Sequence, residues 1–593
     1  MFGNLSRRQW LMGVGAACAW AGSARAADTT NPVVDLPKLN QLGFHPHADK
    51  HFCLTVARTS QMPAATDAGA SVFAGGLDIM GDPGVADRPA GFTVETEAGQ
   101  AVFSGTFGPV ADLTKAVGER VVSGDFSGLT TPGRYRVRCG KRLSAPFTIA
   151  DDVYASLLRD AARTFYIIRA NAALDDPVTG LKYAAGHPSD AHIAVAGQVR
   201  DLTGGWYNAG DFGKWTHMAA ISSSQMMWLY ELRPAAADLK LGTPALWPLP
   251  DLLQQARWGL EWLLKMQNGD GSVLHKVDTE PLYAWGKPPA EDPNPRHARG
   301  ASTIDAGVFI GVMCQAVRVF AKIDPTFAKR CRTAALKSWT WLKANPSVLH
   351  DDPFYTDPDV RQEVAWAYAE MAVLTADAEL AAQAHARFGA LGTSDGADIL
   401  PFFWPSPQVL GAMALARYGN GPARDGAVAG LAHAATVITA EQNTDPYGYS
   451  SDPNRYTWGS LEMALDSAVV CLFAAEVTRD ATFRLTAQRL LDYALGCNAL
   501  GLSFVTGHGT RFVGHPYHWT WRTQKKLIPG WPSGGPNGQP AGADPLLTAV
   551  IARGTPPAKC FVDACEDNGS WASNEGQTTE TAALVLTAGL LGI

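Results

Sequence analysis

The hydrophobic pattern of the chain changes once, near residue 150, and this change limits the folds that the chain can adopt. Before it, short runs of alternating apolar and polar residues are separated by Gly, Pro and Asp turns, as at 52–56, 91–95 and 135–138. Runs of this kind are typical of β-strands, and their spacing favours a two-sheet sandwich. We therefore predict one all-β sandwich domain over residues 33–150.

Residues 152–593 have a helical pattern instead. Apolar residues recur at helical spacing, and Asp152 stands where it would cap the first helix. The predicted helical segments are 152–168, 219–232, 249–266, 306–321, 327–344, 362–375, 380–388, 408–416, 427–441, 461–478, 481–495 and 578–591. Successive helices joined by long loops predict a closed ring of helix hairpins or a solenoid, and no fixed repeat supports the solenoid.

The first 26 residues form a predicted signal peptide. Ser6–Leu11 contains a twin-arginine pattern, a short apolar run follows, and Ala24–Ala26 offers a small-x-small cleavage site. No later run reaches the roughly 20 apolar residues of a membrane span. We therefore expect export by the twin-arginine route to the periplasm or beyond, with no membrane partner.

The composition of the chain limits the kinds of molecule and metal ion that it is expected to bind. A net charge of −7 argues against nucleic acid, which requires a clustered basic surface. The nine cysteines contain no CxxC pair, so no structural zinc cluster is indicated. Disulfides Cys53–Cys139 and Cys560–Cys565 and buried free thiols both remain open from the sequence.

The segment 204–215, Gly-Gly-Trp-Tyr-Asn-Ala-Gly-Asp-Phe-Gly-Lys-Trp, is the most informative motif. Its four glycines allow the backbone to approach a ligand closely. Trp206 and Tyr207 beside the carboxylate of Asp211 suit a sugar site, which needs apolar faces and a group that moves a proton. The alternative is an ordinary loop with a hydrogen-bonded aspartate.

A second motif, Gly569–Glu575, precedes the last apolar helix. Asn574 is placed to cap that helix, with Gln577 at its third position, which approximates a capping box. Glu575 would then be an acidic residue of the first turn, favoured by the helix dipole. A purely structural role is therefore open for Glu575.

Taken in order, the two motifs and the histidine-containing segment after Ser503–Gly507 resemble glycoside hydrolase family 9. Further similarities to the family are Trp262–Gln267, His275–Val277, Tyr456–Ser460, Asp492–Gly496 and Gly534–Asn537. The leading domain resembles the immunoglobulin-like module that precedes many such catalytic domains, through Leu39–Phe44, Asp125–Ser127 and Gly133–Tyr135. The resemblance covers almost the whole mature chain.

This resemblance implies an (α/α)6 barrel that cleaves β-1,4-glycosidic bonds of cellulose-like glucans with inversion. Asp211 matches the general base and Glu575 the general acid, whose carboxyl groups stand roughly 6.5–9.5 Å apart in inverting enzymes. Asn208 is expected to assist catalysis. The expected substrate-binding residues are Trp206, Tyr207, His275, Trp458, Tyr517, His518, Trp519 and Arg522. The expected partner is a β-glucan, and the expected state is a monomer.

The chain departs from the family pattern near both motifs. The family usually has an aspartate where this chain has Asn208, and the loss of that charge should lower the pKa of Asp211 and weaken the base. In 515–522, Tyr517 and Trp519 stand where the family has a histidine and an arginine, while His518 is kept. A local shift that lets Arg522 serve instead is the alternative.

Metals and rival functions complete the predictions. We expect no cofactor. Relatives that bind zinc do so through paired Cys and His, whereas 166–191 has no cysteine and only His187. A structural calcium ion stays open.

The rival enzyme is an exo-acting hydrolase of short gluco- or glucosamine oligosaccharides, for which Asp305 could supply an extra acid. The rival class is a glycan-binding protein with a decayed site, motivated by Asn208 and Tyr517.

Overall fold

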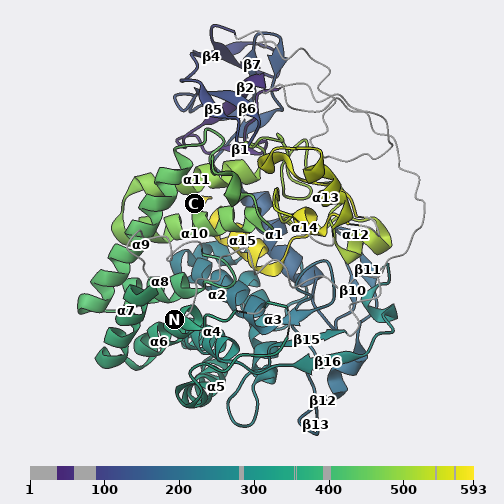
Figure 1. Ribbon diagram of the computed structural model, residues 1–593, viewed down its shortest axis with the longest axis vertical. Coiled ribbons are helices and arrows are strands. Elements are labelled where there is room, and N and C mark those ends of the chain that lie inside the picture. The colour runs from purple at the N-terminus through teal and green to yellow at the C-terminus, as the bar shows by residue number, and fades with distance from the viewer. Residues whose placement is uncertain are drawn as a thin grey trace.

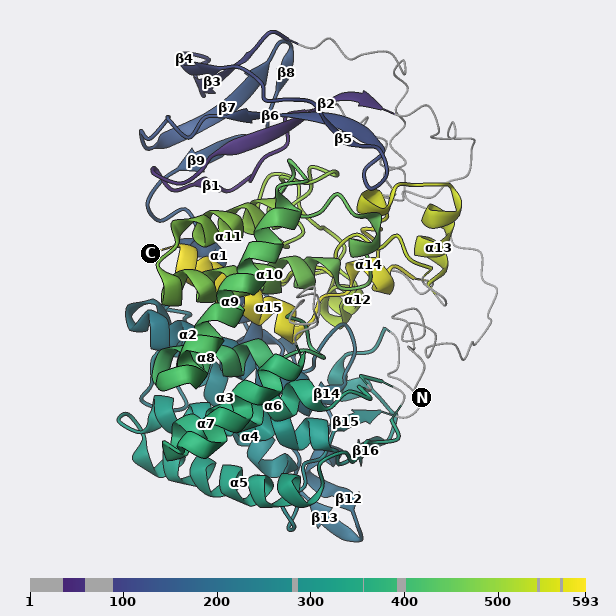
Figure 2. The ribbon, with the colours of Figure 1, turned by 60° about the vertical axis from the view of Figure 1, so that its left-hand side comes forward.

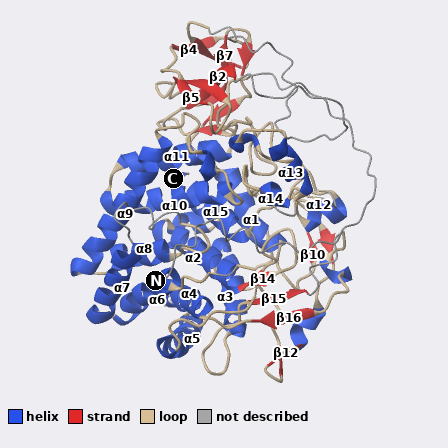
Figure 3. Cartoon of the chain, in the orientation of Figure 1, coloured by secondary structure: helices blue, strands red, loops and turns tan. Residues whose placement is uncertain are grey.

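The computed structural model describes residues 36–58, 89–279, 286–352, 354–355, 357–391, 402–540, 544–565 and 569–592. Figures 1 and 2 show a strand-rich part stacked on a larger helical part, and Figure 3 shows that the larger part holds the helices together with a few short strands. The signal peptide and the predicted start of the sandwich at residue 33 lie outside the described residues. The change in pattern near residue 150 therefore coincides with the change from strands to helices.

The N-terminal part is a sandwich of two sheets. One sheet has the order β1-β9-β7-β3-β4, with β8 paired to β7, and the other has the order β2-β6-β5. Phe44, Phe52, Phe92, Phe126 and Phe147 fill the space between them with edge-on and tilted ring contacts. The strands are β1 (Gly43–Phe44), β2 (His51–Arg58), β3 (Phe92–Thr96), β4 (Ala101–Gly105), β5 (Ala111–Leu113), β6 (Glu119–Asp125), β7 (Gly133–Cys139), β8 (Arg142–Leu143) and β9 (Phe147–Ile149).

Six helices of the C-terminal part form a closed inner ring. Each contacts the next in the order α2, α4, α6, α8, α10, α15, and α15 returns to α2. Nearly every residue of α2, α4 and α15 is buried, because these helices have neighbours on all sides. The inner helices are α2 (Thr216–Leu232), α4 (Thr303–Phe320), α6 (Arg361–Thr375), α8 (Gln408–Tyr418), α10 (Ser460–Thr478) and α15 (Thr578–Leu591).

Six outer helices pack on this ring, one beside each inner helix. These are α1 (Ala155–Ile167), α3 (Asp251–Met266), α5 (Pro325–Ala344), α7 (Ala378–Leu391), α9 (Gly421–Gln442) and α11 (Ala481–Ala494). Short elements in the connecting loops are β10 (Leu174–Asp175), β11 (Lys182–Tyr183), β12 (Ile193–Val195), β13 (Gln198–Arg200), β14 (Lys214–Trp215), β15 (Lys276–Thr279), β16 (Arg296–Arg299), α12 (Trp519–Gln524), α13 (Pro545–Ala552) and α14 (Trp571–Asn574). All twelve predicted helical segments are helices.

Two predicted helix caps are wrong. Helix α1 begins after Tyr154, three residues into the segment expected to start at Asp152, and has no side-chain cap. Asn574 does not cap α15, because it ends the short helix α14 and its amide donates to the carbonyl groups of His515 and Ala564. Gln577 occupies the N-cap position of α15. Glu575 therefore lies between two helices, outside the first turn of α15.

Buried polar contacts join the sandwich to the helical part. The Asn40 side chain donates to Asp492 Oδ1 at 2.8 Å, and Gln41 N donates to the carbonyl of Leu495 at 3.0 Å. Glu119 of β6 pairs with Lys559 and, at 3.4 Å, with Lys38. These two ammonium groups hold the pKa of Glu119 below its usual value even though burial opposes them. The two parts form one packed unit.

Two remaining predictions concern membranes and cysteines. Among the described residues, α4 is long and apolar enough to cross a membrane, but 89% of it is buried within the inner ring, as in a core helix. The eight described cysteines are buried, and Cys53, Cys139 and Cys560 are thiols outside any disulfide. The alternative of disulfides between Cys53 and Cys139, and between Cys560 and Cys565, is therefore not observed.

Candidate active site

Asp211 lies in a tight loop directly before β14. Residues 204–215 are called the base segment here, and the loop is closed by a hydrogen bond from Asn208 N to the carbonyl of Gly213 at 2.9 Å. Gly213 N donates to Asp211 Oδ1 at 3.1 Å, which leaves Oδ2 for another partner. Pairing of β14 with β15 then fixes the far end of the segment.

Glu575 meets the base segment at Gly210. Residues 569–577 are called the acid segment here, and Glu575 Oε1 accepts a hydrogen bond from Gly210 N at 3.0 Å. A Cβ atom at position 210 would lie 2.4 Å from the carbonyl oxygen of Tyr517 and 2.9 Å from Glu575 Oε1. Glycine is therefore required for this contact, and both carboxyl groups remain half-buried rather than sealed in the core.

The two carboxyl groups have raised but unequal pKa values. Burial raises the pKa of Asp211 to about 6, and Asp278 adds to the rise, while the charges of Lys276 and Arg296 oppose it. Burial, followed by the charge of Asp211, raises the pKa of Glu575 well above its usual value. Burial and the charge of Asp211 therefore favour the protonated form of Glu575, whereas Lys276 and Arg296 favour the ionised form of Asp211, which is the division that acid–base catalysis requires.

Asn208 connects the base segment to the start of α15. Its Oδ1 accepts from Thr578 Oγ1 at 2.6 Å, and its amide nitrogen donates to Tyr355 Oη at 3.2 Å. The amide nitrogen also lies 3.5 Å from Gln577 Oε1. Asn208 is buried, so its described contacts are with protein groups and support the loop that carries Asp211.

Tyr355 is a site residue that the sequence reasoning missed. Its hydroxyl lies beside Asn208 and Gln577, and the charges of Asp211 and Glu575 contribute to a pKa raised chiefly by burial. Its φ of 49° is a left-handed conformation that is unusual for a bulky residue and is often found at functional sites. Its ring contacts those of Trp215 and Trp404. The only sequence signal was an aromatic pair, Phe354-Tyr355, in a loop.

Four expected sugar-binding residues are core residues instead. Trp206, Tyr207, His518 and Trp519 are each at most 3% exposed, so none offers a ring face to a sugar. Trp206 packs on Phe165, and Tyr207 Oη pairs with His187 Nδ1 at 2.7 Å. His518 caps α12 and contacts Trp519 and Trp531, and burial lowers its pKa to about 3.

His275 is also buried rather than exposed to a substrate. Its Nδ1 lies 2.9 Å from Asp305 Oδ1, and its Nε2 lies 3.3 Å from the carbonyl oxygen of Phe354. Asp305 is fully buried and also accepts from Ser302 Oγ at 2.6 Å. Asp305 is therefore a structural partner of His275, and it adds no acid to a cleft for an amino sugar.

The other expected sugar-binding residues are half-buried. The carbonyl oxygen of Tyr517 lies beside Gly210. Tyr517 N donates to the carbonyl of Asn574 at 3.3 Å, and the Tyr517 ring meets the Trp571 ring edge-on. Trp458 packs beside a small cluster that includes Leu547 and Ala572. Arg522 donates to the carbonyl of Cys565 at 3.2 Å. Among the described contacts of these three residues, those of Tyr517 reach both the base segment and the acid segment.

One group of potential metal ligands occurs among the described residues. Ligand atoms of His275, Asp305 and His350 lie within 4.8 Å of one another. The two imidazole rings stack face to face at 3.7 Å, so their in-plane lone pairs do not converge on one point, and His275 already bonds to Asp305. His187, the histidine of segment 166–191, uses both ring nitrogens, toward Tyr207 and Asp292. Neither arrangement is suited to a metal ion.

Both parts of the chain match models of known families. Residues 154–588 match the model of glycosyl hydrolase family 9, and residues 37–144 match that of the cellulase N-terminal ig-like domain. The chain therefore belongs to glycosyl hydrolase family 9. Its relatives include endoglucanase C of Cellulomonas fimi, with 31% identity over 84% of this chain, and cellulose 1,4-beta-cellobiosidase of Acetivibrio thermocellus, with 29% identity over 91%.

A solved structure supports the same fold. A metagenome-derived glycoside hydrolase family 9 endoglucanase superimposes with a TM-score of 0.80 and 29% identity, covering 94% of this chain and 98% of the other. By contrast, the chain spans 49% of the length of the Cellulomonas protein and 65% of the Acetivibrio protein. Both curated relatives are therefore considerably longer than the region that they share with this chain.

Proposed function

We propose that this protein is an inverting hydrolase of β-1,4-glucans, with Asp211 as general base and Glu575 as general acid. The observation that carries the proposal is the contact at Gly210, which joins two half-buried carboxyl groups with unequal, raised pKa values. A decayed site would have no need of that arrangement. The names of the relatives, an endoglucanase and a cellobiosidase, agree with a β-1,4-glucan as substrate.

The hydrogen bonds assign a role to each carboxyl oxygen. Glu575 Oε1 accepts from Gly210 N, so the acidic proton resides on Oε2, from which it passes to the glycosidic oxygen as the bond to the anomeric carbon breaks. Asp211 Oδ1 accepts from Gly213 N, so Oδ2 takes a proton from the water that attacks the opposite face of the sugar. The products are an inverted hemiacetal and a free hydroxyl, with Glu575 ionised and Asp211 protonated.

The remaining expectations belong to the same proposal. The closed ring of inner helices with one outer helix beside each has the arrangement of an (α/α)6 barrel. The sandwich is its structural companion, since Glu119 of the sandwich and Lys559 of the helical part form a buried ion pair. We further propose that the protein is exported by the twin-arginine route, acts as a monomer and needs no cofactor.

Two rival functions differ in specific ways. Exo-action on short oligosaccharides is supported by the cellobiosidase among the relatives and by the unusual segment 515–522. The argument for glucosamine oligosaccharides as substrates depended on Asp305 as an extra acid in the cleft. Asp305 is buried against His275, so that argument no longer holds. A glycan-binding protein without turnover is opposed by the unequal pKa values of Asp211 and Glu575.

Reducing-sugar release by the purified protein tests the proposal. The panel is carboxymethylcellulose, mixed-linkage glucan, xyloglucan, cello-oligosaccharides and glucosamine oligomers, with Glu575→Gln and the exposed control Glu97→Gln assayed alongside. Activity on a soluble polymer that only Glu575→Gln abolishes supports endo-action. Release from short oligomers alone establishes exo-action, and glycan binding without release from any substrate overturns the proposal.

A further inference from the structure

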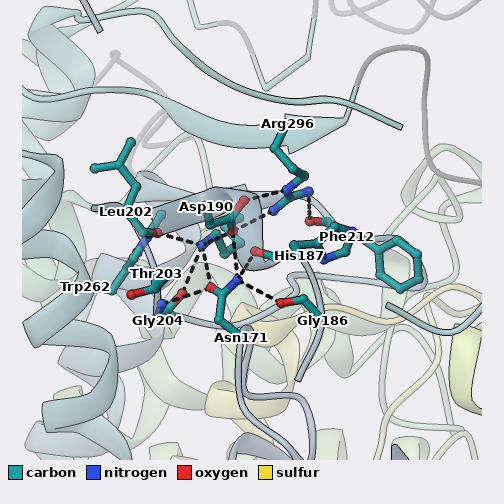
Figure 4. A network of polar contacts seen from close by, with 12 residues as sticks. Asn171, Gly186, His187, Asp190, Leu202, Thr203, Gly204, Phe212, Trp262 and Arg296 are labelled. Carbon is teal, nitrogen blue, oxygen red and sulfur yellow. Dashed lines mark hydrogen bonds and ion pairs between the residues drawn. The ribbon is translucent and has the colours of Figure 1, made fainter. Parts of the chain in front are cut away.

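The ammonium group of Lys214 occupies a cage of oxygen atoms inside the protein. Its Nζ lies 2.7 Å from Asp190 Oδ2, 2.8 Å from the carbonyl oxygen of Leu202, 3.0 Å from Asn171 Oδ1 and 3.2 Å from the carbonyl oxygen of Gly204. Figure 4 shows these acceptors arranged around a common point. Lys214 is fully buried, and its Nζ also lies 5.6 Å from the centre of the Trp262 ring.

This cage has the chemistry of a site for a monovalent cation. Four oxygens surround a group that has only three protons to donate, so the binding depends on charge as well as on individual hydrogen bonds. One anionic and three neutral oxygens match the ligands that alkali cations accept. Burial lowers the pKa of Lys214 to about 8, so the group is cationic at neutral pH.

The cage is connected to Asp211 from both directions along the chain. Lys214 follows Asp211 by three residues in the base segment. Asp190, on the other side of the cage, accepts from Arg296 Nε at 2.9 Å, and Arg296 Nη1 donates to the carbonyl of Phe212, the residue after Asp211, at 2.8 Å. Asn171 holds Asp190 in place through a hydrogen bond of 3.1 Å. These contacts fix the backbone on the C-terminal side of the general base.

We propose that Lys214 is a positioning residue that serves as a built-in cation, and that its removal leaves a site for ammonium or potassium. Its charge ties the base segment to the loops that carry Asn171, Asp190 and Leu202, and so holds Asp211 in its catalytic orientation. The catalytic part of this inference rests on the proposed function, but the cation site does not. Lys214 makes no described contact with the Asp211 carboxyl group, so it acts on geometry rather than on acidity.

The test compares three variants in sodium, potassium, ammonium and tetramethylammonium chlorides of equal ionic strength. Lys214→Ala empties the cage, whereas Lys214→Gln fills it with an uncharged amide. Lys50→Ala is the matched control, since Lys50 is also buried and held by carbonyl oxygens, but in the sandwich. Thermal unfolding measures occupation of the cage without any need for activity, and kcat, KM and the pH profile measure positioning.

For Lys214→Ala in sodium we expect a lower Tm, a kcat reduced by about 100-fold with KM little changed, and the same pH limbs as the wild type. Ammonium or potassium should raise its Tm and restore part of kcat, whereas tetramethylammonium should not. Salts should not restore Lys214→Gln, and Lys50→Ala should keep its kcat. Equal Tm values for Lys214→Ala in all four salts would overturn the cation site, whatever the outcome of the activity assays. A wild-type kcat in Lys214→Gln would overturn the positioning role.

Discussion

The base segment and the acid segment meet at Gly210, but different chemistry holds them in place. The base segment is surrounded by charge: Lys214 lies in its oxygen cage, Arg296 bonds to Phe212, and Lys276 lies close enough to affect Asp211. No cation is among the described partners of the acid segment, and the carboxylate of Asp544 accepts from Ser570 N at 3.0 Å and Ala572 N at 2.9 Å. Asn574 donates to two backbone carbonyls, and Gly210 N is the protein donor to Glu575 among the described contacts.

This difference accounts for the unequal pKa values. Burial raises both pKa values. At Asp211 the Gly213 hydrogen bond and two cations oppose the rise, whereas at Glu575 only the Gly210 hydrogen bond opposes it. A general base must ionise inside the protein, so nearby positive charge favours its function. A general acid must keep its proton, so surroundings with negative and no positive charge, such as Asp211 and Asp544, favour it. The following substitutions, in order of decreasing expected effect, test the contrast.

Glu575→Gln should have the largest effect. The amide has no proton of suitable acidity, so kcat on a β-1,4-glucan should fall by about 10³-fold and the basic limb of the pH profile should disappear. Aryl cellobiosides with an acidic phenol as leaving group should lose much less, because their departure needs no protonation. A loss below tenfold on the glucan, or equal losses on both kinds of substrate, would contradict the role of Glu575.

Gly210→Ala should have the next largest effect, because it removes the close contact between the two segments. The added methyl group would overlap the carbonyl of Tyr517 and crowd Glu575 Oε1, so the segments must separate. We expect kcat to fall by about 100-fold, with a smaller change in KM. Gly269→Ala is the control, since a Cβ there meets nothing within 4 Å. If the two variants had equal kcat, the segments would not depend on this contact.

Lys276→Gln should shift the pH profile rather than abolish activity. The charge of Lys276 lowers the pKa of Asp211, so its loss should raise that pKa above about 6. Because Asp211 must be ionised to act, the acid limb of kcat should move to higher pH, and activity at pH 5 should fall by about tenfold. Lys182→Gln, on the exposed strand β11, should leave the limb unchanged. An acid limb that moved to lower pH would contradict the assignment of Asp211 as base.

Asn208→Asp should give the smallest effect. A carboxylate at this position would repel the charge of Asp211 and raise its pKa, so the acid limb should again move upward. The variant also loses the amide that donates to Tyr355, so we expect only a few-fold change in kcat. Asn454→Asp, at an exposed position, is the control. Identical pH profiles for the wild type and Asn208→Asp would show that position 208 does not tune the base.

The helices could be predicted from the sequence because their signal is local. Apolar residues recurring every three or four positions marked the helices of the ring, and their observed bounds differ from the predicted ones mainly at the ends. The predictions of the helix caps were wrong because the position of a cap depends on where the preceding loop enters the helix. Asparagine is a residue type that often caps helices, but Asn574 is the last residue of the short helix α14 instead.

The site could be predicted only in part, because side-chain composition does not reveal which way a ring faces. Asp211 and Glu575 stood in distinctive motifs, and the structure brings their segments together. Trp206 and Trp519 have the character of sugar-stacking residues, yet tertiary packing turns them into the core. Tyr355 lies far along the chain from both motifs, so nothing in its local sequence indicated a place beside Asn208.

The buried cluster of Glu119, Lys38 and Lys559 bears on how such proteins are assembled from modules. A domain joined by a flexible linker can be exchanged between proteins without affecting the domain that follows it. Here, by contrast, the Glu119 carboxylate of the sandwich neutralises the Lys559 ammonium group inside the helical part. Replacing Glu119 by an uncharged residue would remove this carboxylate from beside the buried ammonium group of Lys559, which is strongly destabilising. The two domains are therefore constrained to evolve as a pair, and recombination at the boundary near residue 150 would succeed only where the new partner supplies an acid at the position of Glu119.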